Sequence, residues 1–282
     1  MRVVCALSAL AGGCNLLFDA TSDDVAVDAA VPDAPVDGEA PWECPALPNF
    51  TNWFVDTLPL TGLGEYRHPT VDPGHDEIYL ASSGDLYVTS MLNPGMPRLV
   101  SALSTRGTED SPSLWPDGEH IFFRSKGELR EGTRVSDGWT VAPVELPVGF
   151  EGAQLGSPAA TTHGLRMIVS STLGDLHELA RARGTDPWHA VPTLERVNDP
   201  VHLDVDPYLS ADGCWLLFSS VRPPALSFDL FGAQRLPDGT FTAAVRLAFM
   251  TGNDDLGATM SPDGHYLLWA QGTARIMRAY PL

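Results

Sequence analysis

The stretch GATMSPDGHYLLW, residues 257–269, joins a tight-turn sequence to a continuous apolar run. Proline presets φ and glycine accepts a positive φ, so Pro262-Asp263-Gly264 predicts a sharp reversal between two strands. The apolar run Leu267–Trp269 after the turn is typical of a strand that is buried on both faces. The same pattern recurs four more times toward the N-terminus, and this repetition decides the fold.

The five copies share one register. If Ala258 is taken as the anchor position of the last copy, the anchors of the other four are Pro69, Pro112, Pro158 and Pro207. Three apolar residues begin nine positions after every anchor: Ile78–Leu80, Ile121–Phe123, Met167–Val169, Leu216–Phe218 and Leu267–Trp269. The anchors lie 43 to 51 residues apart, a period that indicates a repeat architecture.

Each copy has the length of four antiparallel strands. A third strand follows the apolar run in every copy: Asp85–Val88, Glu128–Arg130, Asp175–Leu179, Asp229–Phe231 and Arg275–Met277. Four strands in 40 to 50 residues is typical of a β-propeller blade. The fifth copy lacks an outer strand, whereas Asn52–Leu60, which precedes the first copy, has the character of one. We therefore predict an all-β, five-bladed propeller of four-stranded antiparallel blades over residues 50–282, closed by this N-terminal strand.

The turn Ser261–Gly264, the apolar triple and the third strand Asp229–Phe231 resemble the WD40-like, TolB-type propeller repeat known as PD40. The segment Phe218–Arg222 also resembles the part of that repeat that follows the second strand. The resemblance extends over about 210 residues and implies the propeller fold.

The N-terminus has the features of a bacterial export signal. Arg2 precedes an apolar stretch of 11 residues, which is too short to cross a bilayer. The sequence Leu10-Ala11-Gly12-Gly13-Cys14 resembles a lipoprotein lipobox, which implies cleavage before Cys14 and a lipid on its thiol. Alternatively, Ala9 and Ala11 would serve an ordinary signal peptidase that releases a secreted protein. We predict a signal peptide over residues 1–14.

An acidic linker is expected next, over residues 15–49. Eight acidic residues and no basic one lie between positions 15 and 43. Because like charges repel and the prolines block regular structure, this segment is predicted to be disordered.

Charge and motif content argue against several classes of function. The sequence contains 17 Lys and Arg residues and 36 Asp and Glu residues. The resulting formal charge of −19 argues against nucleic acid as a partner. The sequence has no P-loop, dinucleotide fingerprint, H-E-x-x-H or G-x-S-x-G motif, so we expect neither a cofactor nor a metal. Of the four cysteines, Cys44 and Cys214 lie beyond the signal, and an oxidising periplasm would permit a disulfide between them, although the sequence does not give the Cα separation that such a bond requires.

Acidic residues recur where the chain enters the innermost strand of a blade, at the expected mouth of the axial channel. The ligand-binding candidates at this place are Glu109, Asp110, Asp204, Asp206 and Asp255. Converging carboxylates would bind a cation or a basic peptide, or act as the acid and base of glycoside hydrolysis. The alternative is a structural role in which they bond the neighbouring backbone, as acids at this position of PD40 repeats often do.

Together these features lead to one expected function and one rival. We expect a monomeric, non-catalytic propeller that binds a protein or peptide of the cell envelope, anchored by lipid to the outer membrane or located in the periplasm. Secretion is the alternative location. The alternative function is an extracytoplasmic hydrolase of the glycosidase type, with Glu109, Asp204 and Asp255 at the channel mouth.

Overall fold

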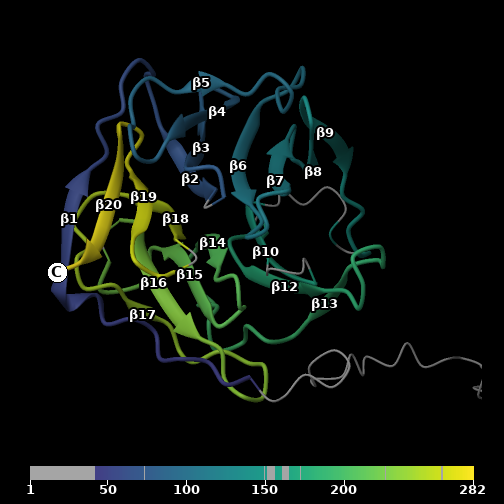
Figure 1. Ribbon diagram of the computed structural model, residues 1–282. Helices are drawn as coiled ribbons and strands as arrows, with labels where there is room; N and C mark the ends of the chain where they lie inside the picture. The colour runs from purple at the N-terminus through teal and green to yellow at the C-terminus, as the bar shows by residue number, and fades with distance from the viewer. Residues whose placement is uncertain are drawn as a thin grey trace, which may run out of the picture.

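The computed structural model describes residues 42–282 except residues 73, 149, 151–155, 161–164, 172, 226 and 262, and it leaves the side chains of residues 156–160 undescribed. The described chain forms five four-stranded antiparallel sheets around a common axis (Figure 1). The predicted five-bladed propeller is therefore confirmed. The expected signal peptide, the lipobox cysteine Cys14 and the linker up to residue 41 lie outside the described residues.

The blades follow one another along the chain, each from its inner to its outer strand. Blade 1 contains β2 (Arg67–Asp72), β3 (Glu77–Ser82), β4 (Asp85–Ser90) and β5 (Arg98–Leu99). Blade 2 contains β6 (Glu109–Leu114), β7 (His120–Ser125), β8 (Glu128–Val135) and β9 (Gly138–Pro143). Blade 3 contains β10 (Gly156–Ala160), β11 (Arg166–Ser170), β12 (Leu176–Ala180) and β13 (His189–Val191). Blade 4 contains β14 (Asp204–Leu209), β15 (Trp215–Ser220), β16 (Asp229–Gln234) and β17 (Val245–Arg246). Blade 5 contains β18 (Asp255–Met260), β19 (Leu267–Gln271), β20 (Arg275–Pro281) and, as its outer strand, β1 (Trp53–Thr57).

The N-terminal strand closes the ring as predicted. β1 lies beside β20 (Figure 1) and pairs with it antiparallel, from Trp53 opposite Pro281 to Thr57 opposite Met277. A three-residue 3-10 turn, η1 (Phe50–Asn52), leads into β1. Because the first and last parts of the propeller share one sheet, blade 5 gains its fourth strand and the ring has no open boundary between blades 5 and 1.

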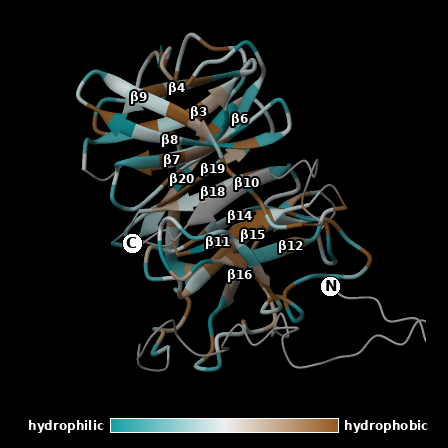
Figure 2. Cartoon of the chain, turned by 90° about the vertical axis from the view of Figure 1, so that its right-hand side faces the viewer, coloured by the Kyte–Doolittle hydropathy of each residue, from teal (hydrophilic) through white to brown (hydrophobic). Residues whose placement is uncertain are grey.

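The hydrophobic core lies between neighbouring blades. All fifteen residues of the apolar triples are at most 2% exposed, as expected for strands covered on both faces. One cluster joins Ile168 and Leu176 of blade 3 to Leu209 and Phe218 of blade 4. Figure 2, coloured by hydropathy, shows brown apolar stretches within the successive sheets.

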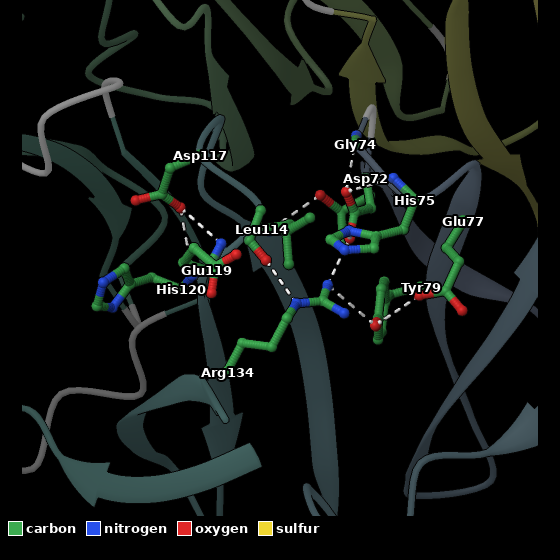
Figure 3. Close-up of polar contacts among 12 residues, drawn as sticks. Asp72, Gly74, His75, Glu77, Tyr79, Leu114, Asp117, Glu119, His120 and Arg134 are labelled. Atoms are coloured by element: carbon green, nitrogen blue, oxygen red, sulfur yellow. Dashed lines mark hydrogen bonds and ion pairs between the residues drawn. The ribbon is translucent and has the colours of Figure 1, made fainter. Parts of the chain in front are cut away.

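Arginines near the ends of the third strands of blades 2, 3 and 4 also join neighbouring blades. Arg134, Arg181 and Arg235 each lie over an aromatic ring of their own blade, with the guanidinium carbon 4.3–4.5 Å from the ring centroid. Figure 3 shows how the first of them reaches the preceding blade: Arg134 donates to the buried carboxylate of Asp72, and its Nε donates to the Gly118 carbonyl at 2.8 Å. The guanidinium thus links the two blades at the end of the ring where the inner strands finish.

Residues 42–49 are attached to blade 4, although they were expected to belong to the disordered linker. Cys44 and Cys214 form a disulfide with a Cα–Cα separation of 5.3 Å. The indole nitrogen of Trp215 donates to the Pro45 carbonyl at 2.9 Å, and the side chain of Gln234 donates to the Cys44 carbonyl at 3.1 Å. Leu47 also packs against a core cluster. The disulfide, these hydrogen bonds and this packing together hold residues 42–49 against the propeller.

In the part of the chain that the structure describes, no helix is long and apolar enough to span a membrane.

Candidate functional site

A histidine bridges two carboxylates across the axis of the ring. His68 lies on β2 of blade 1, and its Nδ1 is 2.9 Å from Oδ1 of Asp110 on β6 of blade 2. Its Nε2 is 3.2 Å from Oδ2 of Asp206 on β14 of blade 4. One imidazole therefore ties together three blades, and both of its ring nitrogens are occupied.

The local backbone explains why these side chains reach the axis. Each inner strand breaks register just before its anchor. In blades 1, 2, 4 and 5 the residue at the break has a left-handed φ: 45° at His68, 54° at Ser111, 52° at Asp206 and 61° at Gly257. Such a bulge re-aims the side chains of a strand. Glycine at the position in blade 5 makes room for the imidazole, because a Cβ on Gly257 would lie 2.6 Å from Cδ2 of His68.

The cross-axis network leaves little space among the described residues at the axis. A cavity lined by residues of four inner strands, among them His68, Ser113, Asp206 and Thr259, has a volume of about 20 Å³. That is room for about one water molecule.

The two carboxylates keep His68 positively charged. Burial alone would lower the pKa of the imidazole, but Asp206 and Asp110 outweigh this effect and raise it to about 10. Burial would raise the pKa of Asp110, but the bonds from His68 and the charge of Arg124, 3.0 Å away, hold it far below its usual range. The network is thus an imidazolium between two carboxylates at neutral pH.

We expect the contribution of His68 to stability to disappear at high pH. The pKa rises from 6.5 in the unfolded chain to about 10 in the fold, so the contribution is complete below pH 6.5 and is lost as the pH rises through 10. His68→Gln should therefore lower the free energy of unfolding by roughly 2 kcal/mol at pH 6, and by much less at pH 10.5. Urea denaturation at both pH values measures this difference.

The exposed histidine His265 is the matched control, since its side chain is 76% exposed on the opposite end of the ring. His265→Gln should leave the free energy of unfolding nearly unchanged at both pH values. An equal loss in His68→Gln at pH 6 and pH 10.5 would show that packing, and not charge, is what the imidazole supplies.

Three of the five candidate acids do not face the channel. Glu109, Asp204 and Asp255 are fully buried (0% exposed) between blades. The backbone N–H of each donates to a carbonyl of the preceding blade, at 2.8 Å for Glu109, 2.6 Å for Asp204 and 2.7 Å for Asp255. The expected ring of five carboxylates is therefore corrected: the bulge that follows these residues leaves them inside the blade interfaces, and only Asp110 and Asp206 reach the axis.

The buried acids have different side-chain partners. Asp204 accepts from Arg222 at 2.6 Å and from the backbone N–H of Asp199 at 2.8 Å. Asp255 accepts from Trp269 at 2.8 Å and from Gln271 at 3.1 Å. Burial raises the pKa of Asp255, and the charge of Asp229 adds to the effect. Asp204 thus has a cationic partner, whereas Asp255 is stabilised in its protonated form.

A pocket opens between blades 1 and 2 at the end of the ring where the inner strands begin, which we call the mouth face. Its volume is about 190 Å³. The charged residues that line it are Glu65, Arg67, Glu109, Asp110 and Arg124, and Ser82, Ser83, Gly84 and Thr108 complete most of the wall. Arg67 pairs with Glu65 at 3.0 Å, and Arg124 pairs with Asp110 at 3.0 Å.

His68, Arg67 and Arg124 are not among the candidate binding residues predicted from the sequence, although His68 and Arg67 stand at the same strand entry as the candidate acids. One signal was present: Gly257 stands where the other copies carry His68, Ser111, Ser157 and Asp206, which indicates that a neighbouring side chain needs the space. In the described residues, no group of three or more His, Cys, Asp or Glu side chains is arranged to hold a metal ion.

No family model matches the sequence, and no curated protein matches it. Among solved structures, a protein of Agrobacterium tumefaciens assigned as a TolB is similar with a TM-score of 0.46 and 18% identity, covering 72% of this chain and 69% of that one. TolB from Acinetobacter baumannii has a TM-score of 0.46 and 14% identity over 77% of this chain, which spans 54% of that protein.

A third structure covers more of the chain. It is a Trichoderma reesei protein of the carbohydrate-active enzymes family AA12, with a TM-score of 0.50 and 8% identity, and the match covers 87% of this chain and 100% of that one. What is shared is the propeller fold. The identities are too low to carry an activity over to this chain.

Proposed function

We propose that this chain is an exported, lipid-anchored propeller that binds a protein or peptide of the cell envelope through its mouth face, without catalysis. The observation that carries the proposal is that the N-terminal segment is attached to the end of the ring opposite the mouth face. The first described residues, Trp42 to Pro45, are fastened to the lower end of blade 4, where β15 begins and β16 ends. A tether that arrives there leaves the mouth face directed away from the anchor.

The disulfide supports the export part of the proposal. Disulfides persist in oxidising compartments such as the periplasm and the extracellular space. Cys44 and Cys214 are joined in the fold, and each belongs to a segment that the bond stabilises. An oxidising compartment is therefore the location in which the Cys44–Cys214 disulfide would persist.

The mouth face carries exposed apolar side chains that suit a protein partner. Leu173 and Val201 are about four-fifths exposed, and Leu203 is 45% exposed. Leu203, at the start of blade 4, lies against Gly174, which follows Leu173 in the turn between β11 and β12 of blade 3 and accepts the bond from the Asp204 N–H. Val201 precedes Leu203 by two residues. Exposed apolar residues beside charged ones are typical of protein-binding surfaces.

The glycosidase alternative finds no support in the geometry. A glycosidase needs a protonated carboxyl and a second carboxylate with the sugar between them. At the axis, Asp110 is ionised between His68 and Arg124, and Asp206 is bound to the same imidazole. The cavity beside His68 and Asp206 holds about 20 Å³, which is too small for a sugar ring. Asp110 also lines the pocket of about 190 Å³, but there it is paired with Arg124 and His68, so it does not supply a protonated carboxyl.

A photo-crosslinking experiment on the full chain tests the proposal. A benzophenone amino acid at Leu173 or Val201, on the mouth face, is expected to capture an envelope protein in cells. Leu173→Asp should abolish capture from Val201, because a charge on the patch opposes burial against a partner. The measurement is the appearance of a discrete crosslinked adduct and its identification by mass spectrometry.

The matched control carries the same amino acid at Asp117 or His265, on the opposite end of the ring. Capture from these positions instead of from the mouth face would overturn the proposed orientation, and hydrolysis of a glycan panel by the purified chain would overturn the absence of catalysis. Mass spectrometry of the mature N-terminus tests the lipid anchor. A diacylglyceryl group on Cys14 supports the anchor, and an unmodified N-terminus at Gly12 contradicts it.

A further inference from the structure

Two buried polar atoms at the mouth-face pocket have no hydrogen-bond partner within the described protein. They are Oγ of Ser82, a residue that is 2% exposed, and Oε2 of Glu109, which is 0% exposed. Both residues line the pocket of about 190 Å³ between blades 1 and 2. Buried polar groups are nearly always hydrogen-bonded, so an unpartnered pair at one pocket indicates a group that enters from outside.

Glu109 differs from the acids at the equivalent positions of blades 4 and 5. Asp204 has the guanidinium of Arg222, whereas Asp255 also has one unpartnered oxygen, Oδ2, but lines none of the described pockets, and burial and the charge of Asp229 raise its pKa. The donors to Glu109 are two hydroxyls, those of Thr105 at 2.5 Å and Ser125 at 3.0 Å, and both bond the same oxygen, Oε1. Its second oxygen is therefore the natural acceptor for a cationic donor.

The chemistry of the pocket selects among cations. Ca²⁺ and Mg²⁺ are bound by six or more oxygens, whereas the pocket offers two unpartnered ones, and Zn²⁺ prefers nitrogen and sulfur ligands, which no unpartnered atom here supplies. A guanidinium needs a fork of acceptors, and only one carboxylate oxygen is unpartnered. A primary ammonium carries three N–H donors on one compact atom, which matches one carboxylate oxygen and one hydroxyl. The net charge of −19 draws such a group toward the chain.

The rim of the pocket does not compete for this role. Arg67 is paired with Glu65 and Arg124 with Asp110, so their charges are balanced at the entrance. A volume of about 190 Å³ accommodates an ammonium with a few carbon atoms behind it. We propose that the pocket binds a primary ammonium group of the partner, with Oε2 of Glu109 and Oγ of Ser82 as acceptors. This inference rests on the proposed function and names what the mouth face recognises.

Titration calorimetry with the full chain and three small probes tests the inference. The probes are triglycine with a free amino terminus, Nα-acetyl-lysine methylamide, and N-acetyl-triglycine amide, which has no ammonium. At least one of the first two should bind and the third should not; which of the two binds distinguishes a peptide N-terminus from a lysine side chain. Loss of one hydrogen bond to a charged group corresponds to about tenfold in affinity or more.

Glu109→Gln and Ser82→Ala should each weaken binding by about tenfold or more, while Asp117→Asn, on the opposite end of the ring, should leave it unchanged. Ser82→Ala removes a hydroxyl that has no partner, so its thermal melting should equal that of the wild type. If Glu109→Gln does not fold, Ser82→Ala decides alone. Three results would overturn the inference. They are binding of the acetylated probe as tight as that of the free amines, no binding of either amine, and unchanged affinity in Ser82→Ala.

The outcome separates this inference from the proposed function. If neither amine binds but crosslinking from Leu173 still captures a partner, only the ammonium site is wrong. If the amines bind and no partner is captured from the mouth face, only the proposed function is wrong.

Discussion

Arg235→Met is expected to lower the free energy of unfolding by about 3–5 kcal/mol, because it leaves a buried carboxylate without its main partner. Arg235 and Glu178 are both 0% exposed and form two bonds across the interface of blades 3 and 4, at 2.7 and 3.2 Å. Arg235 also donates to the carbonyls of Gly213 and Gly239 at 2.8 Å. Methionine retains much of the apolar stem, so the charge is the main thing lost.

The pH dependence of this loss identifies its cause. Burial would raise the pKa of Glu178, but Arg235 outweighs this effect, and Arg166 and Thr193 assist, so the pKa lies below its usual value. The contribution of Glu178 is therefore present above its unfolded pKa and is lost as the pH falls through the lowered one. In Arg235→Met the pKa of Glu178 should rise, and protonation should relieve much of the penalty. Urea denaturation should show a smaller deficit at pH 4.5 than at pH 7.

Arg98→Met is the matched control. Arg98 pairs with Glu77 at 2.9 Å, but its side chain is 70% exposed, so its loss should cost less than about 1 kcal/mol. The double variant Arg235→Met with Glu178→Met should be more stable than Arg235→Met alone, since no charge is left unpaired. Equal losses in Arg235→Met and Arg98→Met would show that the buried pair contributes no more than a surface pair.

The parts of the fold that the sequence predicted are those where burial alone decides. An apolar triple such as Leu216–Phe218 has no polar face, so it specifies a strand covered on both sides, and all such positions are buried. The ring closure was also predictable, because a count of strands leaves one missing at the C-terminus and one extra near Trp53. Neither conclusion depends on the direction of any individual side chain.

The candidate site depends on side-chain direction, and there the sequence was insufficient. The bulge before each anchor changes which residues face the axis, so Asp110 and Asp206 reach it. Glu109, one position before Asp110, and Asp204, two positions before Asp206, are buried. A bulge adds one residue to one strand and leaves no fixed signature in the sequence. The arginines that pair with these acids lie at variable spacings, such as Arg124 beyond Asp110 and Arg222 beyond Asp204, and only the fold brings them together.

The shared position of the arginines at the blade interfaces also could not be predicted from the sequence. Arg134, Arg181 and Arg235 occupy one structural position, yet the turns before them differ in length, which hides the equivalence in the sequence. Their partners differ as well, since Arg134 bonds Asp72 and Arg235 bonds Glu178 of the preceding blade. A shared cationic position with unrelated acidic partners can be recognised once the blades are superposed in space, and not before.

Removal of the Cys44–Cys214 disulfide should lower the free energy of unfolding by about as much as Arg235→Met does. The bond joins residues separated by 170 positions, and closing so long a loop restricts the unfolded chain strongly. In the chain-entropy account the loss on removal is about 4–5 kcal/mol, or roughly 10 °C or more in melting temperature for a chain of this size. The bond also holds Trp42, whose ring lies 4.8 Å from the guanidinium of Arg235, against the buried ion pair.

Thermal melting of Cys44→Ser, Cys214→Ser and the double variant measures this contribution. Because either single change removes the whole bond, the double variant should melt within about 2 °C of the less stable single one. Cys44 is half-buried and Cys214 is 5% exposed, so Cys214→Ser should be the less stable of the two, since its hydroxyl enters the interior. The wild type under reducing conditions should melt near Cys44→Ser. A reduced wild type that melts with the oxidised one would mean that the clamp between the N-terminal segment and blade 4 rests on the Trp215 and Gln234 hydrogen bonds alone.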